Sequence, residues 1–155
     1  MDNLNQWIIL LEVLGASFLA GIVGFEREHS NKPAGFRTHM IVGAATCLMM
    51  SLGGHLIEQF TMLDQVESLR IDPTRIIEAI VVGVSFIGAG TILKSESKEK
   101  IRYLTTAATI LLSAAIGISV ALNQYILAVG TSLLALIINT VLNLVEKKFK
   151  EKRDN

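Results

Sequence analysis

An uncharged stretch of 43 residues, from Tyr103 to Val145, limits the possible folds of this chain more than any other feature. A helix needs about 20 apolar residues to cross a hydrocarbon core of about 30 Å. The stretch is therefore too long for one crossing and long enough for two, with Leu122-Asn123-Gln124 as the natural turn between them. A lipid bilayer is the expected environment of this part of the chain.

Three further apolar segments precede this stretch. Together with its two halves, they predict five transmembrane helices at about residues 7–25, 38–57, 76–93, 103–121 and 125–145. Hydrophobic residues make up 51% of the 155 residues, and the 18% that are charged gather in a few blocks. We therefore expect an all-α integral membrane bundle. Residues 1–155 would form a single transmembrane domain that ends in a basic cytoplasmic tail, residues 146–155.

The basic residues are distributed unevenly over the connections between these segments. Lys and Arg in short loops are retained on the cytoplasmic side of a membrane. With the N-terminus outside, 12 of the 14 basic residues would be cytoplasmic, and only Arg70 and Arg75 would be external. A cleavable signal peptide would begin with positively charged residues, but no Lys or Arg precedes the first segment. The predicted topology therefore has an external N-terminus and a cytoplasmic C-terminus.

Polar residues near the ends of the predicted helices form two layers. The inner cluster comprises Glu26, Arg27, Glu28, Arg37, His39, Thr105 and Thr106. The outer cluster comprises Glu12, Asp72, Arg75 and Glu78. We expect Arg37 to pair with Glu26 or Glu28, because a charge at a helix entrance is readily satisfied by a nearby carboxylate.

Two carboxylates, Glu12 and Glu78, lie inside predicted spans. A charge near the bilayer centre costs roughly 3 kcal/mol on insertion scales, so such a residue is seldom without a role. Snorkelling toward the surface, or a neutral carboxyl group, is the alternative explanation for both. Asp72 and Glu78 are the candidate metal ligands. Asp72 is also expected to cap the third helix, with Pro73 at the first helical position.

No sequence motif indicates an enzyme. The chain has no nucleophile elbow, P-loop, HExxH or paired-Cys motif, and its three His residues lack metal-ligand spacing. We expect no catalytic residue and no cofactor, and we interpret Cys47 as a small buried hydrophobic residue. The balance of 14 basic and 14 acidic residues gives no reason to expect a nucleic-acid partner.

Small and hydroxylated residues recur on one face of three predicted helices. Such stripes favour close helix packing in a membrane, and we prefer this reading to a pore lining. The stripes are Ser17, Gly21 and Gly24 in the first helix; Thr106, Thr109, Ser113 and Gly117 in the fourth; and Ser132, Ala135, Asn139 and Asn143 in the fifth.

Five motifs in a fixed order resemble the MgtC/SapB family. They are GFERE, KPAGFRTHMIVG, DPTRI, GVSFIGAG and LTTAATILLSAAIG, and the resemblance extends from Leu10 to about Val145. It implies a charged signature at Glu26, Arg27, Glu28, Lys32, Arg37, His39, Asp72 and Arg75, and a small-residue signature at Gly83, Gly88 and Gly90 and at Thr105, Thr106, Ala107 and Ala108. Ser85 and Tyr103 depart from the family pattern. Many longer members carry a cytoplasmic domain after the last helix, where we expect only the short basic tail here.

The resemblance implies a bacterial inner-membrane protein with five spans that supports adaptation to low Mg²⁺ and, in pathogens, virulence. Its implied mode of action is regulation of other membrane proteins, including the F-type ATP synthase. The alternative is a transporter or channel for Mg²⁺ or another cation. The expected partners are the lipid bilayer, other membrane proteins, Mg²⁺ and further copies of the chain in a homo-oligomer.

Overall fold

A computed structural model describes residues 3–62, 72–93 and 100–151, with side chains omitted at residues 62, 100–102 and 142–151. The described ranges form five helices and contain no strand, which confirms the predicted all-helical fold. The helices are α1 (Asn3–His29), α2 (Phe36–Met62), α3 (Thr74–Leu93), α4 (Lys100–Ala121) and α5 (Tyr125–Glu151).

Four of these helices are long and apolar enough to cross a membrane. They are α1, α2 as far as Thr61, α3, and α4 from Tyr103 onward; the apolar part of α5 within the described side chains, Tyr125–Val141, is shorter. Large apolar side chains cover the outside of the bundle, with Phe86 81% and Ile126 89% exposed. An exterior of this kind suits contact with lipid rather than with water.

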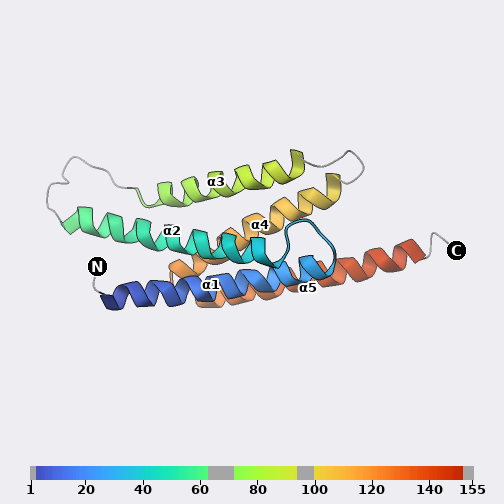
Figure 1. Ribbon diagram of the computed structural model, residues 1–155, viewed down its shortest axis with the longest axis horizontal. Helices are drawn as coiled ribbons and strands as arrows, with labels where there is room; N and C mark the ends of the chain where they lie inside the picture. Colours follow the sequence, from blue (N-terminus) through green and yellow to red (C-terminus); the bar gives the residue numbers. More distant parts are fainter. Residues whose placement is uncertain (1–2, 63–71, 94–99, 152–155) are drawn as a thin grey trace.

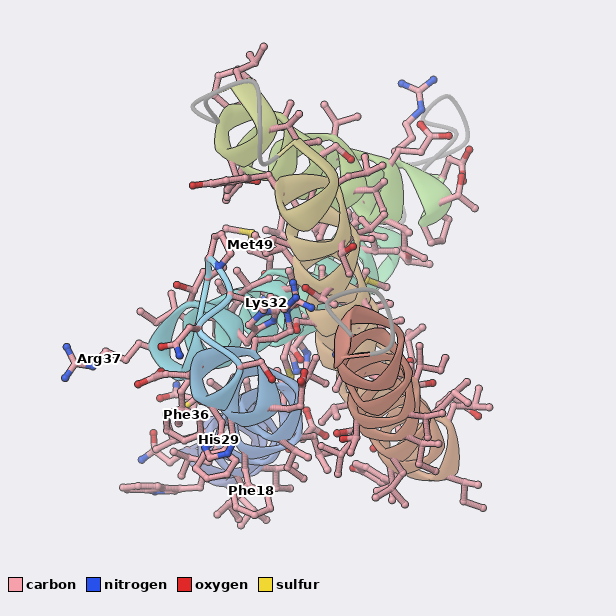
Figure 2. All side chains as sticks on the ribbon, turned by 90° about the vertical axis from the view of Figure 1, so that its right-hand side faces the viewer. Phe18, His29, Lys32, Phe36, Arg37 and Met49 are labelled. Carbon is pink, nitrogen blue, oxygen red and sulfur yellow. The ribbon has the colours of Figure 1, made fainter. Side chains whose placement is uncertain are left out.

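Consecutive helices run in opposite directions along the long axis of the bundle (Figure 1). We call the two ends of the bundle the N-terminal end, where α1 begins, and the C-terminal end, where α1 is joined to α2 and where α5 ends. Helix α4 packs against all four other helices, whereas α3 contacts only α4 and α2 within the described residues. Helix α3 is therefore peripheral, as the view along the long axis also shows (Figure 2).

Asparagine residues with positive φ end two of the helices. Asn123 has a φ of 58°, and the next N–H, that of Gln124, donates a 2.8 Å hydrogen bond to the Ser119 carbonyl. Asn31 has a φ of 51°, and the N–H of Lys32 likewise bonds to the Arg27 carbonyl at 2.9 Å. This pattern satisfies the last carbonyls of a helix and reverses the chain. The α4–α5 turn lies at Leu122–Gln124, as the sequence predicts.

Small residues bring α2 close to α1 and α4 in the middle of the bundle. A Cβ added to Gly43 of α2 would lie 2.6 Å from the Cβ of Ala20 and 2.9 Å from the Ala16 carbonyl oxygen. A Cβ added to Gly117 of α4 would overlap the Thr46 hydroxyl and the Gly43 carbonyl. The Thr46 hydroxyl also bonds across helices to the Ala114 carbonyl oxygen at 3.2 Å. We call this region the Gly43–Gly117 crossing.

The crossing predicts opposite effects for two substitutions on α2. Gly43→Ala should destabilise the folded protein by about 1–3 kcal/mol, because its methyl group overpacks the contact with α1. Gly54→Ala is the matched control, since a Cβ there meets no atom within 4 Å. It should leave stability unchanged or raise it by up to about 1 kcal/mol through helix propensity. Thermal loss of monodisperse protein in detergent measures both effects, and equal melting of the two variants would contradict the close contact.

Candidate functional site: a buried polar cluster

Charged and polar side chains are buried together at the C-terminal end of the bundle. Glu26 and Arg27 of α1 are only 9% and 3% exposed, and Thr106 of α4 is fully buried. The Nη2 atom of Arg27 donates a 3.1 Å hydrogen bond to the Thr106 hydroxyl, a contact between residues 79 positions apart. A buried guanidinium needs such partners, because an unsatisfied charged group in an apolar interior is very costly.

A second buried hydrogen bond joins α2 to α4. The Nδ1 atom of His39 lies 2.7 Å from the Ser113 hydroxyl oxygen, and both side chains are fully buried. Gly24 of α1 makes room for His39, since a Cβ at this position would lie 2.8 Å from the His39 Cβ. The hydrogen bonds of Arg27 and His39 therefore tie α4 to both α1 and α2.

The two carboxylates beside Arg27 have different roles. The Ser30 hydroxyl donates a 2.8 Å hydrogen bond to Oε1 of the buried Glu26. Glu28 is exposed, and its Oε2 accepts a 2.8 Å hydrogen bond from the N–H of Phe36, the first residue of α2. Glu28 thereby satisfies one of the free N–H groups at the start of that helix. It connects α1 to α2 rather than lining the interior.

Arg37 does not form the expected ion pair with Glu26 or Glu28 in the described part of the chain. Its side chain is exposed and points away from the bundle (Figure 2). The reason is its position on α2. The buried Thr46 lies nine residues further along, or about two and a half helical turns, so Arg37 is on the opposite face. Arg27 occupies the interior instead.

The predicted inner cluster is thus partly assembled. Glu26, Arg27, His39 and Thr106 are buried there, whereas Glu28, Arg37 and Thr105 are exposed. Thr109 and Ser113 belong to the buried set but were expected only to pack. Ser113 follows Thr106 by seven residues, about two helical turns, so both lie on one face of the helix. This spacing is the sequence signal that could have assigned Ser113 to the cluster.

The predicted outer residues lie on two helices that do not touch within the described chain, α1 and α3. Glu12 of α1 is half-buried and interacts with the Tyr125 hydroxyl of α5. Asp72, Arg75 and Glu78 are exposed at the beginning of α3. Among the described residues, no three His, Cys, Asp or Glu side chains are placed to hold a metal ion.

Asp72 caps α3, as expected. Its Oδ1 accepts hydrogen bonds from the Thr74 hydroxyl at 2.7 Å and from the Thr74 N–H at 2.9 Å. These bonds stabilise the charged form and hold the pKa of the Asp72 carboxyl below its ordinary value, with a smaller contribution from Arg75.

Of the three α3 glycines in the small-residue signature, only Gly88 meets a neighbouring helix within the described residues. A Cβ at Gly88 would lie 3.3 Å from the Cβ of Ala107 in α4. Gly83 and Gly90 are exposed, and an added Cβ at either position meets no atom within 4 Å. Gly88 therefore lies on the face of α3 that packs, and Gly83 and Gly90 lie on the outer face.

Apolar helices of spanning length and an exterior compatible with lipid define a multi-pass membrane protein. The sequence also identifies the family. The MgtC family model matches residues 13–148, and the chain belongs to this family.

Several relatives share about a third of their aligned residues with the chain. YhiD of Escherichia coli K12, named as a candidate magnesium transporter, is 36% identical over 83% of this chain and 58% of its own length. SapB of Bacillus subtilis 168 is 33% identical over 83% of this chain and 54% of its own length. MgtC of Brucella abortus 2308 is 39% identical over 67% of this chain and 38% of its own length. The chain thus spans about half the length of the curated relatives it matches. No solved structure matches it.

The buried cluster predicts unequal effects for two arginine substitutions. Arg27→Gln should destabilise the protein by about 1–3 kcal/mol, because it disturbs the hydrogen bond to Thr106 inside a buried polar network. Arg37→Gln, its matched control, should change the free energy of unfolding by less than about 0.5 kcal/mol, because Arg37 is exposed. Unfolding in mixed micelles measures both values. A larger loss of unfolding free energy in Arg37→Gln than in Arg27→Gln would contradict the burial of Arg27 and the exposure of Arg37.

Proposed function

We propose that this protein is a regulator of MgtC type in the bacterial inner membrane. It would support adaptation to low Mg²⁺, and virulence where the bacterium is a pathogen, by acting on other membrane proteins such as the F-type ATP synthase. Membership of the MgtC family and the apolar helices support this assignment. The choice of regulation over transport rests on the Gly43–Gly117 crossing.

Mg²⁺ holds its water shell tightly and is bound by oxygen ligands in near-octahedral geometry. A transport path must therefore be wide enough for the hydrated ion, or be lined by carboxylates that replace its water molecules. At the Gly43–Gly117 crossing, α1, α2 and α4 approach so closely that one added methyl group would overlap a neighbour. Glu12 lies on one side of this crossing and Glu26 on the other. The interior between these three helices is therefore closed to a hydrated ion.

Transport of Mg²⁺ or another cation is the second candidate. It is favoured by the name of YhiD and by the charged residues buried in the bundle. A path would then lie between copies of the chain in a homo-oligomer, outside the closed interior of one copy.

Two measurements test this function. Inverted vesicles from cells that express the protein should acidify more slowly with ATP than vesicles from control cells with the same ATP synthase content. Purified protein in liposomes should pass no Mg²⁺, and Glu78→Gln should change neither flux nor bound Mg²⁺. Glu78 is exposed, so this substitution removes a charge while keeping the shape of the side chain.

Unchanged ATP-driven acidification would contradict regulation of the ATP synthase. Mg²⁺ flux that disappears in Glu78→Gln would overturn the regulatory proposal and support transport.

We further propose five spans, with an external N-terminus and a cytoplasmic C-terminus. The opposite directions of consecutive helices and the 12 basic residues on the predicted cytoplasmic side support this topology (Figure 1). A reporter that is active only in the cytoplasm should work when it is fused after Asn155 and fail after Asp64. The reverse pattern would show that the orientation is wrong.

A further inference from the structure

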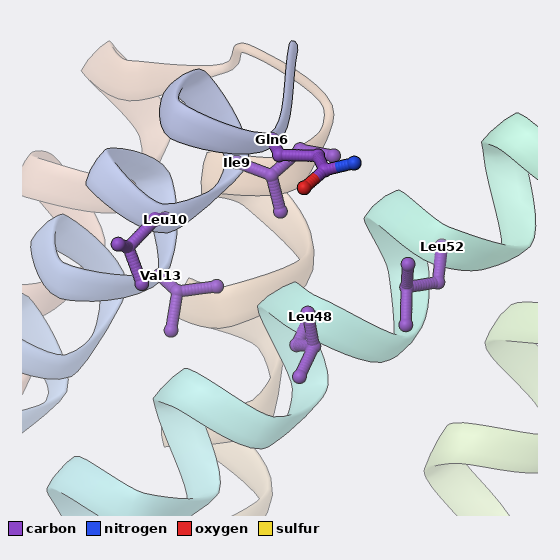
Figure 3. Close-up of a pocket in the computed structure, with 6 residues that line it drawn as sticks. All are labelled: Gln6, Ile9, Leu10, Val13, Leu48 and Leu52. Atoms are coloured by element: carbon purple, nitrogen blue, oxygen red, sulfur yellow. The ribbon is translucent and has the colours of Figure 1, made fainter. Parts of the chain in front are cut away.

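An apolar groove lies between α1 and α2 on the N-terminal side of the Gly43–Gly117 crossing. Its cavity volume is about 400 Å³. Figure 3 shows its lining, which consists of Gln6, Ile9, Leu10 and Val13 from α1 and Leu48 and Leu52 from α2. No function described above uses this groove.

The groove results from the change in side-chain size along the two helices. At Gly43 the backbones of α1 and α2 are close, whereas the next turns toward the N-terminal end carry larger aliphatic residues. Ile9, only 7% exposed, lies on the inner side, and Leu10, Leu48 and Leu52 are 47%, 41% and 44% exposed. The groove therefore opens on the surface that faces lipid.

The groove becomes polar at one end. Gln6 precedes Val13 by seven residues on α1, and His55 follows Leu48 by seven residues on α2, so each continues the same helical face. Because the helices are antiparallel, both residues lie toward the N-terminal end of the bundle (Figure 1). His55 Nδ1 is 3.4 Å from the Glu58 carboxylate. Gln6 is the one polar side chain among the six lining residues, so the groove is apolar along most of its length and polar toward the beginning of α1, which is the polarity of a phospholipid.

We propose that this groove binds one acyl chain of a phospholipid, whose ester and headgroup lie beside Gln6 and His55. A second copy of the chain is the rival occupant. Between helices in a membrane there is no hydrophobic driving force, so association depends on small residues and on hydrogen bonds between helices. None of the six lining residues is Gly, Ala, Ser or Thr. The lining thus favours a flexible acyl chain, and the proposal does not depend on the regulatory function.

The test uses phosphatidylethanolamine with a photoreactive diazirine on one acyl chain, incorporated into nanodiscs with the full-length protein. After irradiation, mass spectrometry of peptides should locate more label at residues 9–13 and 48–52 than on the outer face of α5 near Leu133, which is equally exposed to lipid. Leu48→Trp should abolish the excess label by filling the groove. Met49→Trp is the matched control, because Met49 is an exposed neighbour outside the lining.

Uniform labelling around the bundle, or excess label that persists in Leu48→Trp, would overturn the proposal. Loss of the excess in both tryptophan variants would also do so. If Leu48→Trp is not monodisperse, Leu52→Trp fills the groove from the next turn and replaces it. A disulfide between two copies that carry Leu10→Cys and Leu52→Cys, in place of the lipid label, would assign the groove to a protein interface.

Discussion

The near contact of the α2 backbone with α1 and α4 is the constraint on which the rest of the bundle depends. Gly24, Gly43 and Gly117 each occupy a place where a side-chain carbon would overlap a neighbouring helix. In lipid, where apolar burial does not drive helices together, such close approach supplies dispersion contacts and allows hydrogen bonds between helices. It aligns His39 with Ser113 and Arg27 with Thr106 at the C-terminal end, and it leaves larger side chains to separate α1 from α2 at the other end.

Buried charges in such a bundle are tolerated because their partners are built into the same helices. A charged group is costly in an apolar interior, so the buried Glu26 and Arg27 need partners in the folded state. Ser30 bonds to Glu26, and Thr106 bonds to Arg27. These hydrogen bonds favour one arrangement of the helices, since shifting α4 would break its bonds to both α1 and α2.

Much of the helical architecture could be predicted from the sequence because local chemistry determines it. Uninterrupted apolar length predicts the helices, Leu122-Asn123-Gln124 predicts the tight turn, and Asp72 with Pro73 predicts the helix cap. The interior of the site depends on how each helix is rotated, which charge alone does not reveal. Arg27 and Arg37 are both basic residues near a helix end, yet only Arg27 faces α4. For the same reason, the sequence does not show which α3 glycine packs against a neighbouring helix. In the structure Gly88 does so, whereas Gly83 and Gly90 face outward.

Burial also separates the residues that can maintain the fold from those that can meet a partner. Arg27, His39 and Thr106 are enclosed by α1, α2 and α4, so another protein could be affected by them only through the positions of these helices. Arg75 and Glu78 are exposed on α3, which contacts only α4 and α2 within the described chain. Arg37 is exposed near the start of α2, at the opposite end of the bundle. A direct contact with another membrane protein would therefore involve exposed residues such as these, while the buried cluster holds the scaffold that presents them.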